Sequence, residues 1–296
     1  MIENNFFSIL KEKKLLVSDG ATGTNLIQRG LPQGKTAEEW VLDNSEKILQ
    51  LHKDFINAGS DIILTATFGG SRIRLDQSGL ADRFYDVNSK AAAIAKEAAK
   101  NTSVMIAGSI GPLGHMLKPL GPLDEKDADI FYRDQAKVLM ESGVDIILIE
   151  TQFDLAEASI GVNAALSAGS IPVICSFSFD RGTRTMMGVS PAKFAQTIGK
   201  TGVAALGINC GKSLDDNQNA LKELAAATDL PVWFKPNAGL PKLTDSGQPI
   251  YDVTPEIMAS QVNAWIKSGA KIIGGCCGTS PVHLSAIADA VHKYKW

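Results

Sequence analysis

SGVDIILIET (residues 142–151) contains a helix-ending glycine, a run of apolar residues and then an acidic residue. Glycine suits the left-handed conformation in which helices commonly end. Residues 145–149 are apolar enough for a strand that is buried on both faces, as the strands of a parallel sheet are. Glu150 then falls at the carboxyl end of that strand. The stretch therefore predicts one unit of a parallel α/β fold whose strand ends in a polar group.

The same unit recurs along the chain. Glycines also end helical segments before strands at Ala58-Gly59 and Ser268-Gly269. Amphipathic segments at residues 45–58, 127–142 and 254–268 predict helices, the first with Ser45 as its N-cap. Eight strands are predicted, at residues 15–18, 61–65, 104–107, 145–149, 171–177, 203–208, 231–234 and 271–273. Eight strand–helix units are the number that closes a (β/α)₈ barrel.

An open, doubly wound sheet is the alternative fold, and periodicity alone does not exclude it. The position of the polar residues favours the barrel, because barrel enzymes place their chemistry at the carboxyl ends of several different strands. Such residues here are Asp19, Thr67, Ser109, Glu150, Asn209, Asn237 and Cys276. We therefore expect a single (β/α)₈ TIM barrel over residues 1–296, with a short N-terminal helix around Phe6, Phe7, Ile9 and Leu10 covering the barrel bottom.

Composition narrows the class of protein. The chain has 296 residues, is 45% hydrophobic and carries a formal net charge of -3, which argues against a broad nucleic-acid surface. No segment has the unbroken apolar length that crosses a bilayer, and polar residues interrupt the N-terminus before a signal-peptide core could form. We expect a cytoplasmic protein that binds neither nucleic acid nor membrane.

The four cysteines are Cys175, Cys210, Cys276 and Cys277, and in a reducing compartment such a set is typical of metal or catalytic chemistry rather than disulfides. Cys175 lies inside the fifth predicted strand and is expected in the core. The other three follow the sixth and eighth strands, whose loops share one rim. Three thiolates leave one tetrahedral position open, which is the pattern of a catalytic zinc. The alternative is that they are small buried hydrophobic residues, which the flanking glycines of GGCCG do not favour.

Together these motifs resemble the homocysteine S-methyltransferase family, most closely the homocysteine-binding module of cobalamin-dependent methionine synthase. The combination of GINC with GGCCGT is the specific part of the resemblance. The matching stretches are DGATGT (19–24), TFGG (67–70), GSIGP (108–112), IET (149–151), GINC (207–210), KPNAG (235–239) and GGCCGT (274–279). The sequence departs from the family in TATF (65–68), where Ala66 replaces a more usual asparagine.

The resemblance implies a (β/α)₈ barrel with Zn²⁺ on Cys210, Cys276 and Cys277, and acidic residues Asp19 and Glu150 at the amino-acid end of homocysteine. Glycine-rich turns often bind anions, so backbone N–H groups of DGATGT are expected to receive the substrate carboxylate. The alternatives are that Asp19 is an N-cap on a following turn and that Glu150 forms a rim salt bridge. The expected substrate-binding set is Asp19, Gly20, Glu150, Thr151, Asn209 and Asn237.

Asn237 has two interpretations that the sequence does not separate. It follows the seventh strand, between the two cysteine-bearing loops, and could occupy the open zinc position when substrate is absent. It could equally be a turn residue, because PNAG suits turns.

The expected reaction is methyl transfer to the thiol of homocysteine, which forms methionine. A thiol that coordinates zinc loses its proton, so the enzyme, a methyltransferase, needs no nucleophilic residue of its own. No Asp-x-His-x-x-Gly cobalamin motif is present, so we expect methylcobalamin on a separate corrinoid protein as the methyl donor. The alternatives are a small onium donor such as S-methylmethionine, another thiol acceptor, or a non-catalytic zinc- or thiol-binding barrel. Betaine is not favoured, because Phe68 is followed by two glycines rather than by a cage of aromatic residues.

Overall fold

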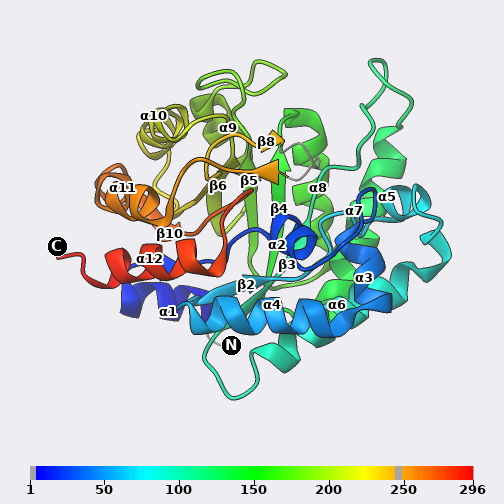
Figure 1. The fold of residues 1–296 in the computed structure, drawn as a ribbon. Helices are drawn as coiled ribbons and strands as arrows, with labels where there is room; N and C mark the ends of the chain where they lie inside the picture. Colours follow the sequence, from blue (N-terminus) through cyan, green and yellow to red (C-terminus); the bar gives the residue numbers. More distant parts are fainter. Residues whose placement is uncertain (1–4, 244–248, 296) are drawn as a thin grey trace.

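The computed structural model describes residues 5–243 and 249–295, which form a barrel of eight parallel strands surrounded by helices (Figure 1). The strand order is β1-β10-β7-β6-β5-β4-β3-β2, and a parallel bridge between Ser18 and Ile62 joins the two outer strands. The barrel is therefore closed, as the sequence predicted. The strands are β1 (Leu16–Val17), β2 (Ile62–Leu64), β3 (Met105–Ile110), β4 (Ile146–Gln152), β5 (Val173–Phe177), β6 (Ala205–Cys210), β7 (Val232–Pro236) and β10 (Ala270–Ile273).

All eight predicted strands are present, and several extend beyond the apolar residues from which they were predicted. In β6 and β7 the pairing extends through Asn209 with Lys235 and through Cys210 with Pro236. Backbone pairing continues there because it does not require apolar side chains, whereas the sequence pattern stops where those side chains stop. The extension matters because it places polar side chains on rigid strand ends instead of on loops.

The helices of the barrel follow the strands as expected. Gly59, Gly143 and Gly269 adopt the left-handed conformation after the three predicted helices, with φ of 102°, 84° and 108°. The helices are α1 (Asn5–Lys13), α2 (Thr22–Gln28), α3 (Ala37–Asp43), α4 (Ser45–Asn57), α5 (Arg72–Asp76), α6 (Phe84–Ala98), α7 (Glu125–Glu141), α8 (Leu155–Ala168), α9 (Pro191–Ile198), α10 (Leu214–Ala225), α11 (Pro255–Lys267) and α12 (Pro281–His292), with a 3₁₀ turn at Ala81–Arg83.

Two local features differ from the sequence expectations. Ser45 is the first residue of α4 and not its N-cap; the cap is Asn44, which also ends α3 by donating its N–H to the Trp40 carbonyl. One residue thus joins the two helices, so no room is left for a separate cap. A small hairpin of β8 (Lys242–Leu243) and β9 (Pro249–Ile250) stands outside the barrel, and its strands are too short to leave a sequence pattern.

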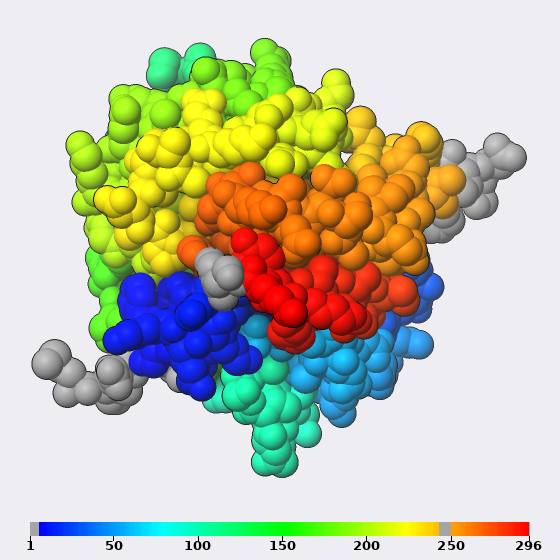
Figure 2. All heavy atoms as spheres, turned by 90° about the vertical axis from the view of Figure 1, so that its left-hand side faces the viewer, coloured from blue at the N-terminus to red at the C-terminus, as the bar shows by residue number. Residues whose placement is uncertain are grey.

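The N-terminal helix closes the barrel bottom, as predicted. Phe6 and Leu10 are buried in the same cluster as Leu16, Leu148 and Trp233, whose side chains fill the lower interior. Phe7 lies on the outer side and is 48% exposed. Figure 2 shows α12, in red, lying beside α1 and α4, so the first and last helices share one face of the molecule.

No helix among the described residues is both long and apolar enough to cross a bilayer.

Candidate functional site

Three of the four cysteines converge at the carboxyl rim of the barrel. The sulfur atoms of Cys210, Cys276 and Cys277 all lie within 4.8 Å of one another, and those of Cys210 and Cys276 are 3.0 Å apart. They meet because β7 alone separates β6 from β10 in the sheet. The expected convergence is thus confirmed. Cys175 is fully buried in the core, also as expected.

The backbone around the cysteines requires the glycines that frame them. A Cβ on Gly274 would lie 2.7 Å from the Asp19 carbonyl oxygen, and one on Gly275 would lie 2.4 Å from Thr279 Cγ2. The loop therefore packs too closely against the end of β1 at Gly274, and against its own Thr279 at Gly275, for any side chain at these positions. Cys210 itself has a φ of 60°, a left-handed conformation that is costly for a residue with a Cβ.

The electrostatics of the cluster favour a bound cation. Hydrogen bonds from Cys210 and Cys276 lower the pKa of Cys277 to about 3. The hydrogen bonds that Cys210 makes to the other two cysteines, together with its burial, raise the pKa of Cys210 well above its ordinary value. Negative charge in the cluster is thus favoured on Cys277, whereas further thiolates would repel one another in a buried site. A metal cation would relieve that repulsion, so the three residues could hold a metal ion.

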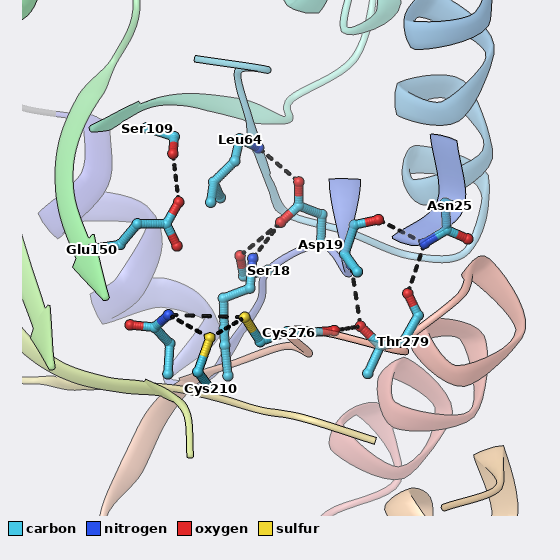
Figure 3. A network of polar contacts seen from close by, with 12 residues as sticks. Ser18, Asp19, Asn25, Leu64, Ser109, Glu150, Cys210, Cys276 and Thr279 are labelled. Carbon is cyan, nitrogen blue, oxygen red and sulfur yellow. Dashed lines mark hydrogen bonds and ion pairs between the residues drawn. The ribbon is translucent and has the colours of Figure 1, made fainter. Parts of the chain in front are cut away.

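Asp19 lies close to this cluster, two residues past the end of β1 (Figure 3). Its side chain is 1% exposed; one carboxylate oxygen accepts the Leu64 N–H at 2.7 Å, and the other pairs with Lys235 Nζ at 2.6 Å. The N-cap of α2 is Ala21, so Asp19 does not cap that helix. Asp19 is thus a buried, fully engaged carboxylate.

Glu150 is buried across the barrel, at the end of β4. It accepts a hydrogen bond from the Ser109 hydroxyl and, among the described residues, forms no salt bridge at the rim (Figure 3). Burial raises the pKa of Glu150 to about 7, in spite of the opposing attraction of Lys235. A carboxyl group of this kind would gain from a cationic ligand.

Lys235 is a site residue that sequence reasoning missed. Burial lowers its pKa, but the attraction of Asp19 and Glu150 outweighs burial, so the pKa lies above its ordinary value. Its ammonium group also lies 5.8 Å from the centre of the Trp233 ring, one layer lower in the barrel. A lysine at the end of a strand buried on both faces was the available signal, because such a charge needs a buried partner.

Thr151 and the two asparagines take different positions. Thr151 follows Glu150, lines the cavity described below and has a φ of 60°. Asn209 is fully buried and hydrogen-bonds Thr151. Asn237 donates to the Gly211 carbonyl at 2.8 Å, while its buried Oδ1 has no hydrogen-bond partner among the described residues.

A cavity of about 720 Å³ opens above these groups. Its inner wall contains Gly20, Glu150, Lys235 and the three cysteines, whereas Asp19 lies behind Lys235 and does not line it. Its outer wall is formed by the loops after β1 and β2 and includes Glu38, Phe68 and Arg74. The cavity thus joins a thiol-rich, charged inner end to an outer end that carries both signs of charge.

Comparison with known proteins agrees with this arrangement. The family model described as homocysteine S-methyltransferase matches residues 16–291. A methionine synthase of Mycobacterium tuberculosis is 29% identical over 315 residues, which include 100% of this chain and 26% of that protein. The methionine synthase of Mycobacterium leprae is 28% identical over 301 residues, 95% of this chain and 24% of that protein. The chain therefore spans about a quarter of the length of these relatives.

Among solved structures, the metallated form of the homocysteine methyltransferase MmuM from Escherichia coli has the same fold. Its TM-score is 0.83 at 24% identity, with 97% of this chain and 99% of that chain covered.

Proposed function

The chain belongs to the homocysteine S-methyltransferase family, and from that premise we propose that it transfers a methyl group to the thiol of homocysteine, forming methionine. The observation that carries the proposal is the meeting of three cysteines, Glu150 and Lys235 on one wall of a single cavity. Homocysteine has a thiol at one end and an ammonium and a carboxylate at the other, so it needs soft and charged partners a few ångströms apart.

Zinc is the proposed metal, with Cys210, Cys276 and Cys277 as its protein ligands. Three sulfur ligands with an open fourth position suit a catalytic zinc. When bound, zinc would hold the substrate thiol as the thiolate, the form that attacks a methyl group. Asn237 is the proposed fourth ligand in the absence of substrate, and the unpartnered, buried Oδ1 of its side chain supports that role.

Glu150 is the proposed partner of the substrate ammonium. It lines the cavity, and the arriving cation would favour the ionised form of a carboxyl group that burial holds partly protonated at neutral pH. Asp19 is proposed to act indirectly, without contacting the substrate, because its carboxylate is already paired with Lys235. It fixes the Lys235 side chain and balances its charge.

The substrate carboxylate is proposed to lie over the turn that begins at Gly20 and leads into α2, beside Thr151. The first residues of that helix line the cavity, and its N-cap residue Ala21 supplies no side-chain hydrogen bond to their N–H groups. Free N–H groups at a helix start attract a carboxylate. The metal-binding thiols also fit a reducing compartment, and we propose a cytoplasmic location.

The proposed methyl donor is methylcobalamin carried by a separate corrinoid protein. The likeness to methionine synthases, of which this chain spans only about a quarter, supports it. A carrier of this kind would approach at the carboxyl rim, where the cavity opens.

A small onium donor is the second candidate, and the outer wall of the cavity favours it. Glu38 is 5% exposed and accepts the Gly69 N–H at 2.6 Å. Phe68 rests against Gly111 and is 39% exposed. A buried carboxylate and an open aromatic face together attract a cation. Arg74, which donates no side-chain hydrogen bond to the residues that the structure describes, could receive a donor carboxylate.

Methionine formation by the zinc-loaded protein separates these donors. Homocysteine is supplied in parallel with methylcobalamin, S-methylmethionine, dimethylsulfoniopropionate and betaine. Turnover with methylcobalamin alone supports the corrinoid proposal; turnover with an onium compound overturns it and predicts a raised KM for that donor in Glu38→Gln. If the zinc-loaded protein forms no methionine with any of the four donors, the result would contradict the proposed activity and favour a non-catalytic barrel.

A further inference from the structure

The side chain of Asn209 is held at both ends of its amide group. Its Oδ1 accepts the Thr151 N–H at 2.9 Å and the Ser176 hydroxyl. Its Nδ2 donates to Thr151 Oγ1 at 2.7 Å, to Cys210 Sγ at 3.5 Å and to Cys276 Sγ at 3.8 Å. These contacts fix the amide orientation, because the opposite one would place the amino group against the Thr151 N–H.

Asn209 makes these contacts away from the cavity. Its side chain is fully buried and does not line the cavity, whereas Thr151 and Cys210 do. We predicted from the sequence that Asn209 contacts the substrate, but a side chain in this position is better placed to contact other protein groups. The amide instead joins the ends of β4, β5 and β6 to the loop after β10.

The two residues that Asn209 joins have strained backbones. Thr151 and Cys210 each have a φ of 60°, although neither is glycine. Such conformations persist only where their surroundings hold them in place. Asn209 hydrogen-bonds both the N–H and the hydroxyl of Thr151. Asn209 also directly precedes Cys210 in the chain. The strain therefore lies at the two points where the strand carrying Glu150 and the strand carrying a metal-binding cysteine reach the cavity.

We infer that Asn209 is a positioning residue that donates N–H···S hydrogen bonds to Cys210 and Cys276 and thereby fixes these thiolates relative to the Glu150–Thr151 strand end. The inference rests on the proposed metal site. Outer groups that orient metal ligands commonly affect metal affinity by about 10- to 100-fold. An N–H donor also draws electron density from a thiolate, so its loss raises the energy of the sulfur lone pairs.

Cobalt(II) reports on both effects, because its sulfur-to-metal absorption band shifts with the energy of the sulfur lone pairs. We compare the cobalt-loaded protein with Asn209→Ala, which removes the amide, and with Asn209→Asp, which removes the N–H donors at nearly the same size. Both variants should shift the band to longer wavelength and weaken cobalt binding by about 10- to 100-fold in competition with a chelator. Circular dichroism checks that each variant is folded.

Ser176→Ala is the matched control, since Ser176 contacts only the oxygen end of the amide. Its band should stay at the wild-type position, because both N–H···S hydrogen bonds remain. If either folded Asn209 variant keeps the wild-type band and affinity, the inference is wrong. If the wild-type protein binds no cobalt through its cysteines, the proposed metal site itself fails, which is a different result.

Discussion

Two successive layers inside the barrel, only two residues apart on the same strands, have opposite chemistry. The lower layer is apolar and includes Leu16, Ala107, Leu148, Ile174 and Trp233, closed from below by α1. The layer above it holds the buried polar groups Ser18, Ser109, Glu150, Ser176 and Lys235. Each member of the second list follows its counterpart in the first by two positions, so both point to the same side of the strand.

The difference between these layers separates stability from function. Apolar side chains in the lower layer gain free energy by leaving water. Buried charges in the upper layer lose hydration and are tolerated only when paired. The pair of Asp19 with Lys235 meets that condition. Glu150 and the three cysteines line the cavity and, among the described residues, have no salt-bridge partner of their own. The upper layer is therefore arranged for a ligand, and each change below tests that contrast.

The largest effect is expected at the three cysteines that are proposed to bind the metal. Cys210→Ser should abolish tight zinc binding and lower activity on the order of 10³-fold, because a catalytic metal supplies several kcal/mol of stabilisation. The barrel should remain folded. Zinc content and methionine formation measure the effect. Cys175→Ser, in the core, is the matched control and should lower the free energy of unfolding by about 1–3 kcal/mol while keeping zinc.

The second effect concerns the buried ion pair. Lys235→Met should lower the free energy of unfolding by about 3 kcal/mol, because it leaves Asp19 as an uncompensated buried charge. The double variant Lys235→Met with Asp19→Asn should recover part of that loss. Urea denaturation measures both. Equal stability of the single and double variants would show that the pair does not balance the upper layer.

The lower layer should respond in stability alone. Phe6→Ala should lower the free energy of unfolding by about 2 kcal/mol, less than a central phenylalanine, because a terminal helix can relax into the space. Phe7→Ala, on the exposed side of the same helix, should change it by less than about 0.5 kcal/mol. Neither substitution should alter the KM for homocysteine. A raised KM in Phe6→Ala would break the separation between the layers.

The smallest effect is a pH dependence that belongs to Glu150. Its pKa in the folded protein, about 7, lies above that of an ordinary glutamate. Because the folded state holds this proton more tightly than the unfolded chain, its contribution to stability falls as pH rises from about 4.5 to 7. Substrate binding runs the other way: the KM for homocysteine should rise about fivefold from pH 7 to pH 6 as the carboxylate is protonated. Glu150→Gln should remove both slopes.

The strands and the cysteine cluster could be predicted from the sequence because both depend on local patterns of residues. Apolar runs mark buried strands, and cysteines after the sixth and eighth of them must share a rim. Side-chain partners on different strands leave no such pattern. Lys235 meets Asp19 across 216 positions of the chain, so neither apolar periodicity nor the KPNAG motif indicates the ion pair.

The remaining differences have similar physical causes. Asn209 follows the predicted strand at residues 203–208 and resembles any other polar rim residue in the sequence. Only its side-chain orientation shows that it faces the sulfur atoms and Thr151. Glu38 lies on α3 and accepts the N–H of Gly69, which belongs to the loop after β2. Helical periodicity does not indicate this contact. Sequence patterns identify which elements form, whereas side-chain partners depend on how those elements close around the barrel.

The most direct test of the central claim is zinc X-ray absorption of the zinc-loaded protein with and without homocysteine. The account predicts three sulfur atoms and one lighter atom around zinc in the free protein, and four sulfur atoms once homocysteine is bound. A sulfur number that stays the same on adding homocysteine, or that is below three in the free protein, would contradict the assignment of Cys210, Cys276 and Cys277 as the site that activates the substrate thiol.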